Sequence, residues 1–233
     1  LIGPGGSGKT RLALAVSEQS VDVFPGGVWF VEFAPLSTAS LLPSTVAETV
    51  GLSETRTEDW TNALAAHLGP RRALLIFDNC EHVAAGAASL ADALLSASPE
   101  LRILATSRER LGLAGEQLLP VPPLALPEPV PWREPADGLR ALNSLRDSEA
   151  GRLFVDRATT VSPDFELTAE IGPTVAEICR RLDGLPLAIE LAAARVRSLS
   201  VRQIADRLDD RFRLLTGGSR TAHPRQHTLH ATL

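Results

Sequence analysis

The pattern of hydrophobic and polar positions divides the chain into two parts. In the first part, short apolar runs alternate with segments in which apolar residues recur at helical spacing. Strands that alternate with helices favour parallel pairing, with helices packed against the sheet. In the second part the strand-like runs end while helical spacing continues. We therefore expect a three-layer α/β domain with a central parallel sheet, followed by a small all-helical domain.

The expected strands are short runs that are apolar or rich in β-branched and aromatic residues. The run 73–78 is apolar until it ends at Asp78, which is typical of a strand buried on both faces. Residues 1–2 resemble the end of a strand. Further runs of this kind cover residues 28–33, 101–106 and 117–121.

Helical spacing and prolines locate the remaining elements. Seven prolines between Pro120 and Pro135 disfavour a helix or a central strand, so this stretch is predicted to be a stiff linker. Helices are expected over residues 10–20, 40–50, 59–68 and 83–98, and in the second part over residues 149–159, 173–182, 187–196 and 201–208.

The composition is that of an ordinary globular protein, with 233 residues, of which 44% are hydrophobic and 22% charged. No apolar run is long enough to cross a bilayer and no signal peptide is evident, so we expect a cytoplasmic location. The net charge of -5 argues against a broad nucleic-acid surface within this chain. Because methionine is absent, we expect the chain to belong to a longer protein.

The strongest motif is a glycine-rich loop of the form G-x-x-x-x-G-K-[ST]. Its glycines let backbone amides approach an anion, and the helix that follows directs its positive end to the same place. Lys9 is the only lysine among 23 basic residues, and it is expected to reach the β- and γ-phosphates of a nucleotide. The alternative is a simple glycine-rich turn. The expected nucleotide-binding residues are Gly3, Pro4, Gly5, Gly6, Ser7, Gly8, Lys9, Thr10 and Arg11.

Asp78 is the expected second half of this site. A carboxylate that closes a buried strand beside the loop would hold magnesium through water, together with the Thr10 hydroxyl. The alternative is an aspartate that caps the next helix. Asn79 follows where many P-loop ATPases have an acidic residue that orients water, so we expect slow hydrolysis, with Glu81 as a possible substitute.

Four stretches in order resemble the STAND class of P-loop ATPases, in the NB-ARC-like branch of large bacterial transcriptional regulators of the LuxR/AfsR type. These stretches are GPGGSGKTRLA, LLIFDNCEH, ILATSRERL and GLPLAIELAAAR. The resemblance covers essentially the whole chain, and the last two stretches are the most particular to this class. It implies an ATP/ADP-binding regulatory switch with Mg²⁺, a slow ATPase activity, and self-oligomerisation in the ATP state.

The resemblance also implies roles for two residues outside the loop. Arg108 is similar to a sensor arginine that faces the γ-phosphate, and its alternative is a solvated surface arginine. Pro186 is similar to a proline that packs near the adenine. From the residues alone, Gly184 and Pro186 suit a junction between two helices whatever their other role.

These inferences give four expected segments. They are a nucleotide-binding domain at 1–124, a Pro-rich linker at 125–146, a helical domain at 147–215, and the start of a further domain at 216–233. The expected partners are an adenine nucleotide and the sensor and output domains of the same longer chain, with DNA contacted only through those domains and no membrane. We take Lys9, Asp78, Glu81 and Arg108 as the candidate catalytic residues. A small-molecule phosphotransferase with the same loop and a non-hydrolysing nucleotide-binding scaffold are the rival functions.

Overall fold

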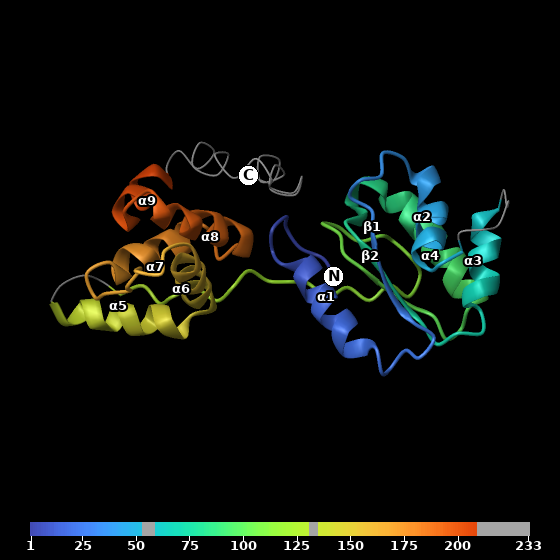
Figure 1. The fold of residues 1–233 in the computed structure, drawn as a ribbon, viewed down its shortest axis with the longest axis horizontal. Coiled ribbons are helices and arrows are strands. Elements are labelled where there is room, and N and C mark those ends of the chain that lie inside the picture. Colours follow the sequence, from blue (N-terminus) through green and yellow to red (C-terminus); the bar gives the residue numbers. More distant parts are fainter. Residues whose placement is uncertain (53–58, 131–134, 209–233) are drawn as a thin grey trace. The chain divides into compact units, whose positions relative to one another are not determined.

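The computed structural model describes residues 1–52, 59–130 and 135–208. Contacts divide the chain into an α/β unit, which contains almost all residues up to Val121, and a helical unit from Pro122 onward. The boundary expected after residue 124 and the segment expected from residue 216 stay predictions, and that segment lies outside the described residues. Each unit is described by itself (Figure 1).

The α/β unit is built on a small parallel sheet, as the alternation of strands and helices predicted. In the described part of the chain its strands are β1 (Val28–Glu32), β2 (Leu74–Asp78) and β3 (Arg102–Ala105), in the order β1-β2-β3. Glu32 lies opposite Asp78 and Phe77 lies opposite Ala105. The carboxyl ends of all three strands therefore meet at one edge of the sheet.

The runs 1–2 and 117–121, which we expected to form strands, contribute only isolated bridges beyond β3. Ile2 pairs in parallel with Ser107 on one side and with Pro120 on the other, and the Val121 amide donates to the Ile2 carbonyl at 2.8 Å. The runs 1–2 and 117–121 thus extend the sheet without forming full strands.

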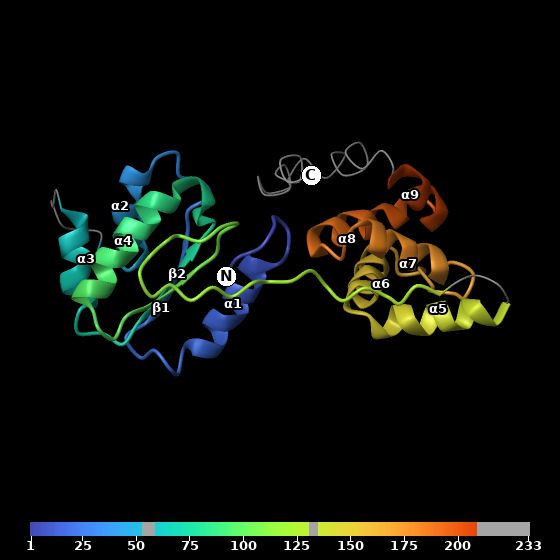
Figure 2. The same ribbon diagram turned by 180° about the vertical axis from the view of Figure 1, so that it is seen from behind.

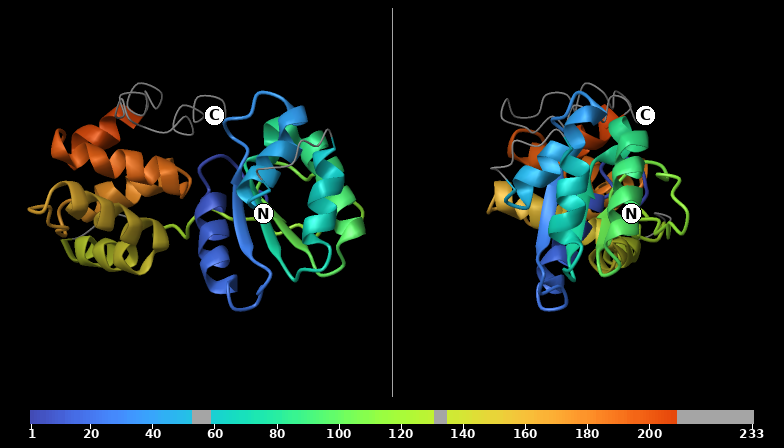
Figure 3. Two further views of the ribbon diagram at one scale, coloured as in Figure 1. Left: turned by 45° about the vertical axis from the view of Figure 1, so that its right-hand side comes forward. Right: turned by 90° about the vertical axis from the view of Figure 1, so that its right-hand side faces the viewer.

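Helices cover both faces of this sheet, as Figure 3 shows. On one face α1 (Lys9–Ser20) packs through Ala13 against Leu74 and Ile76. On the other face α2 (Leu42–Thr49), α3 (Trp60–Leu68) and α4 (Ala84–Ala97) enclose the larger core. The fully buried large side chains of that core include Phe33, Leu42, Leu64, Leu68, Leu75, Phe77 and Leu94.

The helical unit packs short helices around one apolar core (Figure 2). Its helices are α5 (Pro135–Asp147), α6 (Glu149–Val161), α7 (Gly172–Arg181), α8 (Pro186–Ala193) and α9 (Val201–Arg207). Helix α6 packs against α8, and α7 packs against both α5 and α9. The fully buried core side chains include Leu145, Phe154, Ile178, Ile189 and Ile204.

Helix α5 occupies residues that we had expected to form a linker. Its first residue is Pro135, and proline is tolerated at the start of a helix because the missing amide hydrogen has no helical acceptor there. Leu142 and Leu145 are buried, so the helix has an apolar face that contributes to the core. The prolines before residue 135 favoured a linker, and for this reason the apolar face of α5 was not predicted.

Gly184 is the glycine on which the turn between α7 and α8 depends most. Its φ of +68° is left-handed, and an added Cβ would collide with the Leu124 carbonyl oxygen. We expect Gly184→Ala to lower the free energy of unfolding by about 2 kcal/mol or more, from backbone strain and this collision together. Gly112→Ala is the matched control, because its φ is +86° but no atom lies within 4 Å of the added Cβ. Urea unfolding of both variants measures the difference, and equal losses would contradict the role of Leu124.

No helix within the described ranges is both long and apolar enough to cross a membrane. The expected cytoplasmic location stays a prediction.

Candidate functional site

The glycine-rich loop leads directly into α1. Gly6 and Gly8 have φ values of +78° and +95°, a left-handed conformation that side chains with a Cβ rarely adopt. Gly8 is the N-cap of α1, and no side chain caps this helix start. The amides of the first helical turn lack helical partners, so this end of α1 can accept an anion.

The space beside Gly8, where α1 begins, leaves room for such an anion. A Cβ at Gly8 would meet no atom within 4 Å. Within the described residues, no backbone amide from Gly5 to Thr10 donates to a backbone carbonyl. A phosphate group is small enough and rich enough in acceptors to satisfy several of these amides at once.

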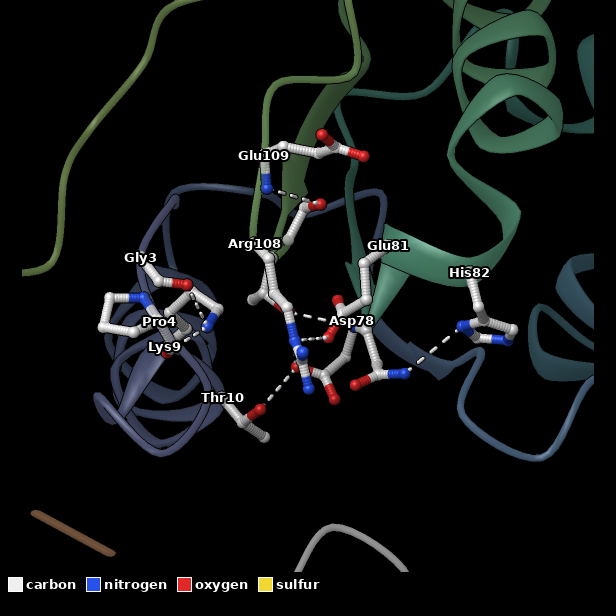
Figure 4. Close-up of polar contacts among 12 residues, drawn as sticks. Gly3, Pro4, Lys9, Thr10, Asp78, Glu81, His82, Arg108 and Glu109 are labelled. Atoms are coloured by element: carbon white, nitrogen blue, oxygen red, sulfur yellow. Dashed lines mark hydrogen bonds and ion pairs between the residues drawn. The ribbon is translucent and has the colours of Figure 1, made fainter. Parts of the chain in front are cut away.

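Lys9 is buried against the loop and 8% exposed. Its Nζ donates to the carbonyl oxygens of Gly3 at 2.8 Å and Pro4 at 2.9 Å (Figure 4). Both acceptors are neutral, so neither cancels the ammonium charge. Burial lowers the pKa of Lys9 below its usual value, while the carboxylate of Glu81 opposes this effect. The loop therefore holds a partly desolvated cation that an anion would stabilise.

Asp78 connects the loop to the sheet. It is fully buried at the end of β2, where its Oδ1 accepts hydrogen bonds from Thr10 Oγ1 and Thr106 Oγ1, both at 2.7 Å. Strand register explains the second contact, since Phe77 pairs with Ala105 and the next residues are Asp78 and Thr106. The carboxylate is thus fixed beside the first turn of α1.

The oxygen donors at this position suit magnesium in part. Thr10 and Asp78 bring one hydroxyl and one carboxylate together, and both are hard oxygen ligands of the kind that Mg²⁺ prefers. No group of three or more His, Cys, Asp or Glu side chains in the described part of the chain could hold a metal. A magnesium ion here would need phosphate oxygens and water to complete its six ligands.

Asn79 has a left-handed backbone, with φ of +65°. Its amide nitrogen donates to Thr106 Oγ1 at 2.9 Å, and its side-chain Nδ2 lies 3.4 Å from Nδ1 of His82. The other ring nitrogen of His82 lies 3.1 Å from the Leu36 carbonyl oxygen. Because a carbonyl only accepts, this ring nitrogen is the donor in the contact with Leu36. His82 therefore lies between the Leu36 carbonyl and the side-chain amide of Asn79.

Glu81 and Arg108 form an ion pair next to these groups. Arg108 Nε lies 3.2 Å from Glu81 Oε1, with 30% and 22% of the two side chains exposed. Glu81 belongs to the short 3-10 turn Cys80–Val83 after β2, and Arg108 follows β3. The second oxygen, Glu81 Oε2, is buried without a hydrogen-bond partner among the described residues.

The structure brings together most of the residues singled out from the sequence. Lys9, Thr10, Asp78, Glu81 and Arg108 converge at the carboxyl edge of the sheet, as Figure 4 shows. Their roles toward a nucleotide stay predictions.

Three other expected residues have different surroundings. Arg11 is exposed in the first turn of α1. Ser7 Oγ is buried without a partner in the described ranges. Pro186 is the first residue of α8 in the helical unit, and its expected place near an adenine stays a prediction.

Two contributing residues were missed by the sequence analysis. Thr106 bonds both Asp78 and Asn79, and its position at the end of the strand next to β2 could have revealed it. His82 carries no such signal, because its contact with Leu36 joins the 3-10 turn after β2 to a loop 46 residues earlier, a distance in space that the sequence does not define.

Comparisons with known proteins find bacterial proteins that are similar to this chain. No family model matches it. It is 46% identical to a protein of Mycobacterium tuberculosis named "Putative HTH-type transcriptional regulator", over the whole chain and 24% of that protein. An uncharacterized protein of the same species is 40% identical, over the whole chain and 54% of its length. The chain thus spans about a quarter to about half of the relatives it matches.

A solved structure supports the fold. A chain in the structure of Drosophila ORC bound to DNA matches with a TM-score of 0.53 and 13% sequence identity, over 95% of this chain and 63% of that chain. At this identity the likeness concerns the fold alone. The chain is an α/β protein with a small parallel sheet and a following group of helices.

Proposed function

We propose that this chain is an ATP/ADP-binding switch module of a transcriptional regulator, built on a three-layer P-loop fold. The observation that carries the proposal is the meeting of Lys9, Thr10 and Asp78 where α1 begins and β2 ends. A cation, a hydroxyl and a buried carboxylate beside unpaired helix amides suit a polyphosphate with its magnesium ion.

In this proposal each group of the loop has a separate task. The amides of the first turn of α1 bind phosphate oxygens, and Lys9 exchanges the carbonyls of Gly3 and Pro4 for charged acceptors. Exchange of neutral for charged acceptors strengthens each hydrogen bond. Magnesium, when bound, neutralises phosphate charge, and Thr10 and Asp78 are the residues that would hold it.

The neighbouring residues favour a switch over rapid turnover. Arg108 follows β3 at the same edge of the sheet, where a guanidinium can distinguish ATP from ADP by the extra phosphate. Asn79 is neutral and cannot take a proton from water, so hydrolysis is slow. A slow step leaves each nucleotide bound long enough for the two states to differ in population.

The regulatory context comes from the relatives. Two of the proteins that this chain matches over its whole length, in Mycobacterium tuberculosis and Mycobacterium bovis, carry the name "Putative HTH-type transcriptional regulator". The chain spans about a quarter of each. The four motifs similar to the NB-ARC-like branch of the STAND class support a switch that acts on other segments of such a regulator, through which DNA would be bound and self-association controlled.

Calorimetry with ADP, a non-hydrolysable ATP analogue and GDP tests the nucleotide assignment. We expect tight binding of both adenine nucleotides, weaker binding of GDP, and a loss of affinity when EDTA removes magnesium. Solution scattering of a full-length relative then tests the switch, which requires different profiles with ADP and the ATP analogue. An absence of binding heat would refute the nucleotide site, and identical profiles would refute the switch.

A further inference from the structure

The contact geometry of the Glu81–Arg108 ion pair is relevant to the preference of the site between ADP and ATP. Only one guanidinium nitrogen, Nε, is in contact with Glu81, at 3.2 Å. An arginine offers five N–H donors, so this contact leaves most of them for another acceptor. Both side chains are partly exposed, and ion pairs of this kind are weak because water competes for both charges.

We propose that Glu81 is a positioning residue that retains Arg108 and thereby sets the preference of the site between ADP and ATP. The inference rests on the proposed nucleotide-binding function and adds a specificity-determining residue to it. Glu81 would act through Arg108, without touching the nucleotide.

Charge gives the direction of the effect. A γ-phosphate attracts the guanidinium, so ATP competes with Glu81 for Arg108. ADP lacks this phosphate and leaves the pair intact. Glu81 therefore weakens ATP binding selectively and has little effect on ADP.

The surroundings of Glu81 hold the carboxylate in place for this task. Its backbone belongs to the turn Cys80–Val83, which follows β2 directly. Its buried Oε2 lacks a partner in the part of the chain that the structure describes, so separation from Arg108 would leave the carboxylate even less well satisfied. The ion pair is weak enough for a phosphate to displace Glu81 from Arg108. Without a phosphate, the paired state is still favoured over the separated state.

A neighbouring glutamate offers a matched control. Glu109 is exposed and directly follows Arg108, and Figure 4 shows its carboxylate pointing away from the guanidinium. Its amide donates to Ser107 Oγ, which a side-chain substitution leaves in place. Glu109→Gln removes the same charge from the same region as Glu81→Gln, without removing the ion pair.

The test measures the affinities of ADP and a non-hydrolysable ATP analogue by calorimetry, for the wild type, Glu81→Gln, Glu109→Gln and Arg108→Ala. We expect Glu81→Gln to raise the ratio of ATP-analogue to ADP affinity by about two- to fivefold, which corresponds to loss of a partly exposed ion pair. Glu109→Gln should leave the ratio unchanged. In an Arg108→Ala background, Glu81→Gln should have no effect on it.

Several outcomes would overturn the inference. An equal increase in the Arg108→Ala background would mean that Glu81 repels the phosphate directly. An unchanged ratio for Glu81→Gln would mean that Glu81 does not set the preference between ADP and ATP. If the wild type bound neither nucleotide, the proposed function itself would fail, and this outcome is distinct from binding with an unchanged ratio.

Discussion

Lys9→Ala is expected to lower the affinity for ADP by about a hundredfold or more. The substitution removes the ammonium group, whose charge-assisted hydrogen bonds to phosphate contribute about 1.5–3 kcal/mol each, and a hundredfold loss corresponds to about 2.7 kcal/mol. Titration calorimetry in the presence of magnesium measures the change. Without nucleotide the variant should fold normally, because the ammonium bonds only the Gly3 and Pro4 carbonyls of its own loop.

Arg102→Ala is a suitable control for this experiment. It also removes one positive charge, but Arg102 begins β3, at the end of the strand opposite the candidate site. Its guanidinium bonds the carbonyls of Pro99 and Leu101. Its affinity for ADP should stay within about twofold of the wild type, since distant exposed charges are screened by salt. Retention of ADP binding by Lys9→Ala would refute the phosphate role of the loop.

Phe77→Ala is expected to lower the free energy of unfolding by about 3–5 kcal/mol. Phe77 is fully buried in β2 and its ring lies 5.0 Å from that of Phe33, at a tilt of 45°. Removal of the ring leaves a cavity directly before Asp78, in the strand that fixes the carboxylate. Guanidinium unfolding followed by circular dichroism measures the loss.

Leu14→Ala provides the comparison, because Leu14 is 41% exposed on α1. Its cost should be within about 0.5 kcal/mol, as for other surface substitutions. If the two variants lost similar stability, the core beneath the candidate site would not depend on β2 in the way the structure indicates.

Local patterns were sufficient to predict the α/β class and the parallel pairing, which the structure confirms. The apolar run ending at Asp78 has the length and composition of a strand with both faces covered, and β2 is that strand. Helix α1 followed from the glycine-rich loop and the apolar spacing behind it. In both cases the signal lay within about a dozen consecutive residues.

Features that depend on distant residues could not be predicted in this way. Helix α5 was missed because prolines before it masked a short apolar face whose partners lie on α6 and α7. The Glu81–Arg108 pair joins residues 27 positions apart, and its geometry depends on how a 3-10 turn and the end of β3 are placed. Both charges were visible in the sequence, but their contact was not.

The hydroxyl of Thr106 imposes a narrow limit on evolutionary change at this position. Its single proton goes to Asp78 while its oxygen accepts the Asn79 amide, so it mediates between an acceptor and a donor in a place from which water is excluded. Valine has nearly the same shape but would leave the Asp78 carboxylate and the Asn79 amide without this hydrogen-bond partner. Serine has the hydroxyl and could form both hydrogen bonds. Among relatives that keep the aspartate, we therefore expect only threonine or serine at this position. An aliphatic residue here would indicate a relative that has lost the site.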